Sequence, residues 1–330
     1  MTHTVREVTL NPMKVANDKT ELVREIPLAC ADETAAIEFM ERQRWGDTPA
    51  CPRCGDCEVA QMKDKDGDRN KRFLWRCKGC KKQFTVRVGT IMEDSPIPLR
   101  FWCLAFYRAC ASKKGVSALQ IKRETGLSYK SALFMMHRIR YAMAPAAVTG
   151  LDGVVAIDET LVGGKRKVRH TKEGRRIDKG TRENKTCVLA MVQRDGNVRT
   201  QILPDRTAPM LMPTIVRHVK PSARIMTDEW IGYHNLKTIY ASHEKVNHSI
   251  KEYARGDVTT NTVEGFFAIV KRGLYGTFHS VSKKHLDRYM SEFEFRYNHR
   301  KMDDGARTVA AIQAADGCHL TYKEQIARDK

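Results

Sequence analysis

The sequence predicts an α/β protein in which a cysteine-rich module and a helical module precede a larger core of strands and helices. Three observations support this arrangement. Apolar runs and turn residues between positions 154 and 228 follow the order strand, strand, strand, helix, strand. Two Cys-x-x-Cys pairs lie upstream of this region. A helical run interrupted by a Thr-Gly-Leu turn lies between the cysteines and the core.

The composition favours a nucleic-acid partner. The chain has 330 residues, enough for two or three domains, and 42% of them are hydrophobic, which is enough to build a core. There are 58 lysine and arginine residues against 39 aspartate and glutamate residues, so the net charge is +19 and the pI is about 9.6. Such an excess favours a polyanion as partner, and a basic protein without such a partner is the alternative.

The sequence shows no signal for membrane insertion or export. No apolar run reaches the length of a membrane span, and the N-terminus has no signal-peptide core. We therefore expect a cytoplasmic protein without a membrane partner. In that compartment the ten cysteines favour metal binding or free thiols over disulfides.

Four cysteines predict a structural zinc ribbon. They form two Cys-x-x-Cys pairs, Cys51 with Cys54 and Cys77 with Cys80, and each pair can turn two thiolates toward one ion. The segment between the pairs should form a hairpin with its tip at 64–68, because Asp-Gly favours tight turns. Two pairs favour metal over the redox chemistry of a single pair. The ribbon should fold only with zinc bound.

Cys57 departs from the simple two-pair pattern. It could replace Cys54 as a ligand, or it could be a bystander. We favour the bystander, because the Cys-Pro-x-Cys-Gly knuckle already pairs Cys51 with Cys54. The spacing leaves open whether the ribbon contacts DNA or a second copy of the chain.

The helical module is typical of a helix-turn-helix. An apolar helix is expected over 99–111, and a second helix should end near Glu124. Residues 125–127 then form a turn, and Ser128 caps a third helix whose start could meet DNA bases or phosphates. An ordinary helical hairpin is the alternative. The candidate DNA-binding residues here are Ser128, Tyr129, Lys130 and Arg138.

Two aspartates stand out in the core. The strands are expected at 154–158, 186–193, 198–203 and 223–228, with a helix at 208–219 before the last strand. Asp158 and Asp228 each end an apolar strand, where an unpaired charge is costly without metal or a partner. Glu159 and Glu229 are the alternatives, because neighbours on a strand point to opposite faces and only one of each pair should enter a site.

A third carboxylate lies on a predicted helix over 261–272. Glu264 and Lys271 are about two turns apart, so both project from nearly the same face, and Asn261 is expected to cap the helix. Two strand-end aspartates and one helix glutamate can converge on divalent metal. Two-metal enzymes of phosphoryl transfer use this arrangement to activate the attacking oxygen and stabilise the leaving oxygen.

A basic segment at 163–185 separates the first two predicted strands. It is broken by glycine and has almost no apolar content, so we expect a mobile loop in the free protein. Because it emerges beside Asp158, Lys165, Arg166 and Lys167 could clamp a DNA phosphate. A solvated run of charge is the alternative.

Several phrases together resemble a known family. Glu264 follows Asp228 by 36 positions and Lys271 follows Glu264 by seven, as in the DDE core of transposases and retroviral-type integrases. The chain from about 30 to 315 resembles bacterial insertion-sequence DDE transposases with an N-terminal zinc ribbon, the ISXO-like group. The phrases that carry the resemblance are Asp158-Glu-Thr-Leu-Val-Gly-Gly-Lys165, Thr227-Asp-Glu-Trp-Ile-Gly-Tyr233, Thr262-Val-Glu-Gly-Phe266 and the run from His285 to Arg300.

The resemblance implies an RNase H-like (retroviral-integrase-like) α/β catalytic core. It also implies that Asp158, Asp228 and Glu264 hold two Mg²⁺ or Mn²⁺ ions, and that Lys271 contacts DNA phosphate near the scissile bond. The implied activity is cleavage and transfer of DNA strands at the terminal repeats of an insertion sequence. The implied partners are double-stranded DNA of element ends and target, and at least a second copy of the chain on DNA. The implied location is the bacterial cytoplasm, in association with the nucleoid.

The predicted division of the chain follows these features. The ranges are 1–45 for a tail and short helix, 46–90 for the zinc ribbon, 91–148 for the helix-turn-helix module, 149–315 for the RNase H-like catalytic domain and 316–330 for a C-terminal tail. Two other functions remain as alternatives. One is an RNase H-like nuclease that cuts without joining. The other is a zinc-dependent DNA-binding regulator with a transposase-derived core, against which the intact acid set argues.

Overall fold

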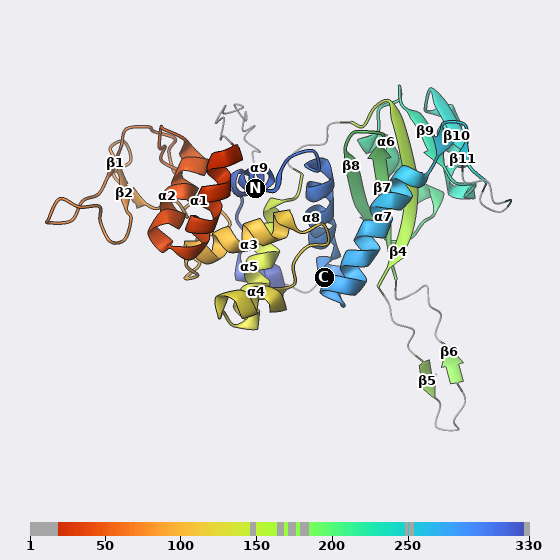
Figure 1. The fold of residues 1–330 in the computed structure, drawn as a ribbon. Coiled ribbons are helices and arrows are strands. Elements are labelled where there is room, and N and C mark those ends of the chain that lie inside the picture. Colours follow the sequence, from red (N-terminus) through yellow and green to blue (C-terminus); the bar gives the residue numbers. More distant parts are fainter. Residues whose placement is uncertain are drawn as a thin grey trace.

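The computed structural model describes residues 19–145, 150–163, 168–170, 176–178, 185–247, 250 and 254–326. Figure 1 shows the cysteine-rich module and the first helices at one end of the molecule and a five-stranded sheet at the other. Several helices lie between these two ends. None of the helices in the described ranges is both long and apolar enough to cross a membrane.

Two helices open the described chain. The predicted short helix is confirmed as α2 (Glu33–Trp45), and Asp32 caps it by accepting a hydrogen bond from Ala35 N at 2.8 Å. Another helix, α1 (Lys19–Ala31), precedes it in the range that the sequence left open between a tail and an early helix. Its buried residues are Leu22, Ile26 and Ala29. These residues are four and three positions apart, which is typical of one face of a helix. The polar residues around them made this pattern hard to recognise in the sequence.

The cysteine-rich module is a small antiparallel sheet. Its strands are β1 (Val59–Gln61), β2 (Trp75–Cys77) and β3 (Gln83–Phe84). The predicted turn between β1 and β2 is confirmed: Asp64 N donates to Asp68 O at 2.8 Å, and Gly67 has a φ of +87°. The module is fixed to α2 through the Glu41 carboxylate, which accepts hydrogen bonds from the Arg69 guanidinium and from the Trp75 indole.

Three helices follow, close to their predicted bounds. They are α3 (Leu99–Ala111), α4 (Ala118–Thr125) and α5 (Tyr129–Ala142). Gly126 ends α4 with a φ of +73°, a left-handed conformation that glycine adopts without steric cost. Ser128 caps α5 as predicted, because its hydroxyl accepts a hydrogen bond from Ser131 N at 3.1 Å.

The end of the chain returns to the N-terminal helices. Helix α9 (Asp304–Gln313) buries Val309, Ala311 and Ile312 in the same hydrophobic core as α1, α2 and α3. The expected catalytic range 149–315 therefore spans two packing units in the structure. A last short helix, α10 (Tyr322–Ile326), places Tyr322 edge-on against Phe134 of α5, with ring centroids 4.8 Å apart.

The central sheet has the strand order β10-β9-β4-β7-β8. Strands β4, β7 and β8 are antiparallel neighbours, whereas β9 runs parallel to β4 and β10 runs parallel to β9. The predictions for β7 and β8 are confirmed, and β10 was not predicted. The bounds are β4 (Val154–Val162), β7 (Thr186–Gln193), β8 (Val198–Leu203), β9 (Arg224–Thr227) and β10 (Ser242–Lys245).

Strand β4 is longer than predicted. It continues to Val162, so Asp158 lies inside the strand and the expectation that it ends the strand is wrong. The extension exists because residues 159–162 keep pairing with β7, although the pairing with β9 stops at Ala156 and Met226. Beyond the end of β9, β4 therefore has a neighbouring strand on one side only among the described residues, and Asp158 lies where this open side begins.

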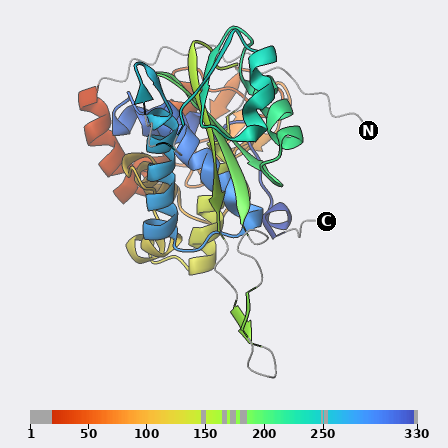
Figure 2. The same cartoon turned by 90° about the vertical axis from the view of Figure 1, so that its right-hand side faces the viewer.

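Helices cover both faces of the sheet (Figure 2). On one face, α6 (Ala208–His218) packs Leu211 and Ile215 against alternate residues of β4, including Val155 and Ile157. On the other face, α7 (Asn261–Gly273) and α8 (Leu286–Asn298) pack against the intervening residues, including Ala156. The two-residue period of a strand thus assigns each position of β4 to one of two cores.

Within 163–185 the structure describes a small antiparallel hairpin of β5 (Val168–His170) and β6 (Arg176–Asp178), where we expected a loop. Figures 1 and 2 both show it away from the central sheet. The remaining short elements are η1 (Ile231–Thr238), β11 (Ala254–Arg255), β12 (Val258–Thr259), the π-helical turn η3 (Leu274–Phe278) and η4 (Lys283–His285).

A histidine is buried where α5 meets α8. The rings of His137 and His285 have centroids 4.5 Å apart, and Tyr289 lies edge-on to His137. His137 Nδ1 is buried without a hydrogen-bond partner among the described residues. Burial is the main cause that lowers the pKa of His137 to about 2, and the neighbouring cationic and histidine groups contribute to this shift. These groups are Arg140, His285, Arg288 and Lys284.

His137 is therefore expected to make the protein less stable in acid. Below the ordinary pKa of 6.5 the unfolded chain binds a proton that the folded protein does not bind. The free energy of unfolding should fall by up to about 1.4 kcal/mol per pH unit below that value from this residue. Urea unfolding between pH 7 and pH 4 measures this slope, and His137→Phe should flatten it. Equal slopes in the two proteins would contradict the prediction.

Candidate functional site

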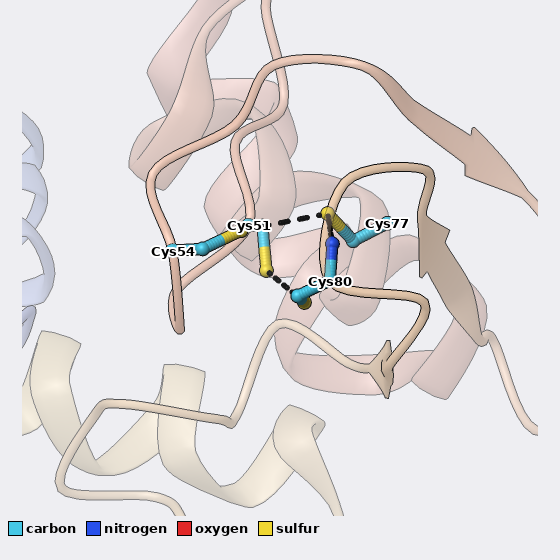
Figure 3. A group of neighbouring side chains, drawn as sticks. All are labelled: Cys51, Cys54, Cys77 and Cys80. Atoms are coloured by element: carbon cyan, nitrogen blue, oxygen red, sulfur yellow. Dashed lines mark hydrogen bonds between the residues drawn. The ribbon is translucent and has the colours of Figure 1, made fainter.

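The four predicted cysteines meet at one point (Figure 3). The Sγ atoms of Cys51 and Cys80 are 3.7 Å apart, and those of Cys54 and Cys77 are 3.6 Å apart. All four Sγ atoms lie within 4.8 Å of one another, and the set is the only such group of cysteine, histidine or acidic side chains found in the described ranges. Four convergent thiols without an open position fit a structural Zn²⁺ ion.

The surroundings of Cys51 favour a thiolate at that position. Burial raises the pKa of the Cys51 thiol, but hydrogen bonds from the amides of Arg53 and Cys54 and from neighbouring thiols outweigh burial and bring the pKa down to about 7. At Cys77 the amide of Cys80 lowers the pKa of the thiol, but burial and hydrogen bonds with the neighbouring thiols outweigh this effect and raise the pKa to about 12. Cys57 stays outside the cluster, as expected of a bystander, since it is exposed and its Sγ lies 3.9 Å from Gly55 O.

The parallel pairing of β4 and β9 brings the two candidate aspartates together. The register pairs Ala156 with Met226, so Asp158 follows two positions later inside β4 and Asp228 follows two positions later, just after the end of β9. Burial is the main cause that raises the pKa of Asp158 to about 7, followed by the charge of Glu159. The hydrogen bond from Glu159 N opposes this shift, and the charges of Asp228 and Glu264 are smaller contributions that raise the pKa.

Helix α7 carries the third carboxylate. Four buried side chains anchor α7 on the sheet, whereas Glu264 and Lys271 are exposed, and the charge of Glu264 contributes to the raised pKa of Asp158. The N-cap residue is Thr260, so the expectation for Asn261 is wrong: Asn261 is the first residue of the helix. Thr260 Oγ1 donates to Glu264 Oε1 at 2.6 Å and thereby orients this carboxylate. The anchoring residues are Val263, Phe266, Phe267 and Val270.

This donor set fits a hard divalent cation. Mg²⁺ and Mn²⁺ prefer carboxylate oxygens, and the three candidate acids of β4, the end of β9 and α7 would supply such oxygens. The carboxylate oxygens do not gather within the mutual 4.8 Å that the four thiols reach. Their shared negative charge nevertheless disfavours ionised Asp158, and a bound cation would reverse that effect.

The alternative acids are placed differently. Glu159 points to the opposite face of β4, where Tyr233 Oη donates to its Oε2 at 2.5 Å and Arg206 lies 3.6 Å from its Oε1. Glu229 is exposed beyond the end of β9. These positions favour Asp158 over Glu159 and Asp228 over Glu229 as candidates, and the assignment remains a prediction.

Comparison with known proteins identifies the family. Residues 31–83 match the transposase zinc-ribbon domain, and residues 150–298 match the ISXO2-like transposase domain. The chain belongs to the ISXO2-like transposases. This confirms the predicted family and the zinc ribbon within it.

Two relatives have names of the same kind. An uncharacterized protein in transposable element ISH50 of Halobacterium salinarum is 28% identical over 274 residues, which cover 80% of this chain and 90% of the relative. An uncharacterized transposase-like protein of Haemophilus influenzae is 30% identical over 105 residues, which cover 32% of this chain and 84% of the relative.

In this transposase, the candidate DNA-binding residues of α5 divide into two groups. Ser128, Tyr129 and Lys130 are exposed at the start of the helix, and Lys130 Nζ also lies 5.1 Å from the centre of the Tyr322 ring. Arg138 is half-buried, and its Nη1 donates to the backbone carbonyls of residues 91 and 93. Because these bonds hold a neighbouring loop, the contacts of Arg138 favour a structural role over DNA binding.

Two sets of residues remain: candidates outside the described part of the chain, and residues that the sequence analysis did not find. The candidates Lys165, Arg166 and Lys167 lie outside the described residues. Sequence reasoning missed Thr260, which contacts the candidate acid Glu264, and Arg206, which contacts Glu159 beside the candidate acid Asp158. The signal for Thr260 is its position four residues before Glu264, one helical turn away. Arg206 has no comparable signal, because its partners come from distant strands.

Proposed function

We propose that this transposase binds the double-stranded DNA ends of its insertion sequence, cuts a strand there and joins it to target DNA. The observation that carries the proposal is the parallel pairing of β4 with β9. It supports a joint role for Asp158 and Asp228, which follow the last paired residues by two positions, and for Glu264 of α7, which packs on the same face as Ala156. The strand order, with three antiparallel strands followed by two parallel ones, supports assignment of the core to the RNase H-like fold.

Each residue has a role in this proposal. Asp158, Asp228 and Glu264 hold Mg²⁺ or Mn²⁺ ions. When bound, the ions activate the attacking oxygen and stabilise the leaving oxygen. The hydroxyl of Thr260 keeps the Glu264 carboxylate oriented. Lys271, exposed on the same helix, contacts the phosphate beside the scissile bond, where its positive charge fixes the DNA backbone.

The other parts of the chain are proposed to bind DNA and to bring copies of the chain together. Helices α4 and α5 act as a helix-turn-helix, with exposed Ser128, Tyr129 and Lys130 at the start of the second helix as DNA contacts. The net charge of +19 supports binding to the DNA backbone. Transfer of two element ends requires that two active sites meet, so the chain is proposed to work as a homodimer or larger assembly on DNA.

A strand-transfer assay tests the proposal. Purified protein is incubated with a labelled duplex carrying the element's terminal repeat and flanking DNA, a supercoiled target plasmid, and Mg²⁺ or none. We expect Mg²⁺-dependent cleavage and joining, and a loss of both to background in Asp228→Asn, because the amide removes a charged ligand. Glu229→Gln, the adjacent exposed acid, is the matched control and should keep both activities.

Other outcomes of this assay would favour the alternatives. Cleavage without joining would replace the proposal with an RNase H-like nuclease. Specific binding to the terminal repeat with no Mg²⁺-dependent chemistry, in the wild type and in Asp228→Asn alike, would leave a zinc-dependent DNA-binding regulator. Full activity of Asp228→Asn would contradict the assignment of the second aspartate.

A further inference from the structure

Arg206 lies between a buried acid and an aromatic ring at the catalytic edge of the sheet. It follows β8, and its guanidinium approaches Glu159 Oε1 at 3.6 Å. The same guanidinium stacks over the Trp230 ring, with Cζ 4.0 Å from the ring centroid. The indole Nε1 of Trp230 in turn donates to Arg206 O at 3.3 Å. The two side chains therefore hold each other by two separate contacts.

This pair connects directly to the second candidate aspartate. The backbone N–H of Trp230 donates to Asp228 Oδ1 at 3.0 Å. A displacement of the Trp230 ring would move this N–H, and the carboxylate that accepts from it would turn. The orientation of the Asp228 carboxylate therefore depends on where Trp230 lies.

Glu159 fixes the other side of Arg206. Its side chain is only 6% exposed, against 34% for Arg206, so the acid is the buried anchor and the arginine is its charged partner. Tyr233 Oη donates to the second carboxylate oxygen of Glu159 at 2.5 Å. The contacts join β4, the loop after β8 and the turn after β9, which are three separate parts of the chain.

We propose that Arg206 is a positioning residue, which holds the Asp228 carboxylate in the orientation that the divalent ion requires. The inference rests on the proposed function, because that function assigns Asp228 to the metal site. A planar guanidinium can stack on the indole while it faces a carboxylate, and this combination explains why an arginine suits the position. Groups that orient metal ligands commonly change metal affinity by 10-fold to 100-fold when removed.

Mn²⁺ binding tests the proposal without relying on activity. The zinc-loaded, full-length protein is titrated with Mn²⁺, and free Mn²⁺ is measured by electron paramagnetic resonance. We expect Arg206→Met to weaken Mn²⁺ binding by about 10-fold. Arg217→Met is the matched control, because Arg217 is an exposed arginine of α6, and it should bind Mn²⁺ like the wild type. Unfolding of the Mn²⁺-free proteins is followed in parallel.

Each outcome of the Mn²⁺ titration either supports or overturns the role proposed for Arg206. Wild-type Mn²⁺ affinity in a folded Arg206→Met would overturn the proposal. If this variant does not fold, Mn²⁺ binding is measured in Arg206→Lys and Glu159→Gln instead. Arg206→Lys keeps the positive charge but not the planar group that stacks on Trp230. Glu159→Gln keeps the acceptor for Tyr233 but removes the ion pair. Weakened binding in these two supports the proposal, and unchanged binding overturns it. Asp228→Asn runs alongside: if it binds Mn²⁺ like the wild type, the site assignment fails and not merely the role of Arg206.

Discussion

Removal of zinc is expected to unfold residues 46–90 of this transposase. The strands of the cysteine-rich module contain only two or three residues each, so they bury too little apolar surface to stay folded alone. Structural zinc in small modules supplies on the order of 10 kcal/mol or more of folding free energy. A strong chelator should therefore release one Zn²⁺ per chain and separate the Trp45 ring from Trp75 and Phe84, which now lie 5.9 and 5.8 Å from it.

Zinc content and tryptophan fluorescence measure this effect together. Cys77→Ser should reproduce the effect of the chelator, because it removes a buried thiol from the cluster. Cys57→Ser is the matched control, since this cysteine is exposed and lies outside the four-thiol group. Full zinc content in Cys77→Ser, or zinc loss in Cys57→Ser, would show that the ligand set is wrong.

Local chemistry explains which elements could be predicted. The cysteine pairs, the cap at Ser128 and the turn around Gly126 each depend on residues within a few positions of one another. For the same reason α3 was predicted with its observed bounds. The edge strand β10 was missed because its residues are polar and all half-buried, so no alternation of apolar and polar residues marks it.

The candidate site was predictable only in part. The sequence places Asp158 and Asp228 beside apolar runs, but their meeting depends on the parallel pairing of β4 and β9, which are separated by four strands and a helix in the chain. Arg138 shows the converse. Its position on a basic helix suggested DNA binding, whereas the structure brings the carbonyls of residues 91 and 93 to its guanidinium. No local pattern reports such a contact.

Glu292 is expected to be one of the most sensitive positions for stability. It lies fully buried on α8, where its carboxylate accepts hydrogen bonds from Arg140 of α5 at 2.6 Å and from Arg296. Burial opposes the charged carboxyl, but these two guanidinium groups lower the pKa of Glu292 below its ordinary value. The Arg140 guanidinium is further enclosed by the Tyr289 ring, 4.0 Å away.

Glu292→Gln leaves two buried cations without their anion, so it should lower the free energy of unfolding by about 3–5 kcal/mol. Urea unfolding at pH 7 measures the change. Asp287→Asn is the matched control on the same helix; Asp287 is exposed, and its substitution should cost no more than about 1 kcal/mol. Helix α5 carries candidate DNA contacts and α8 packs on the central sheet, so this network fixes the two helices relative to each other. A loss below 1 kcal/mol in Glu292→Gln would mean that other contacts fix α5 against α8.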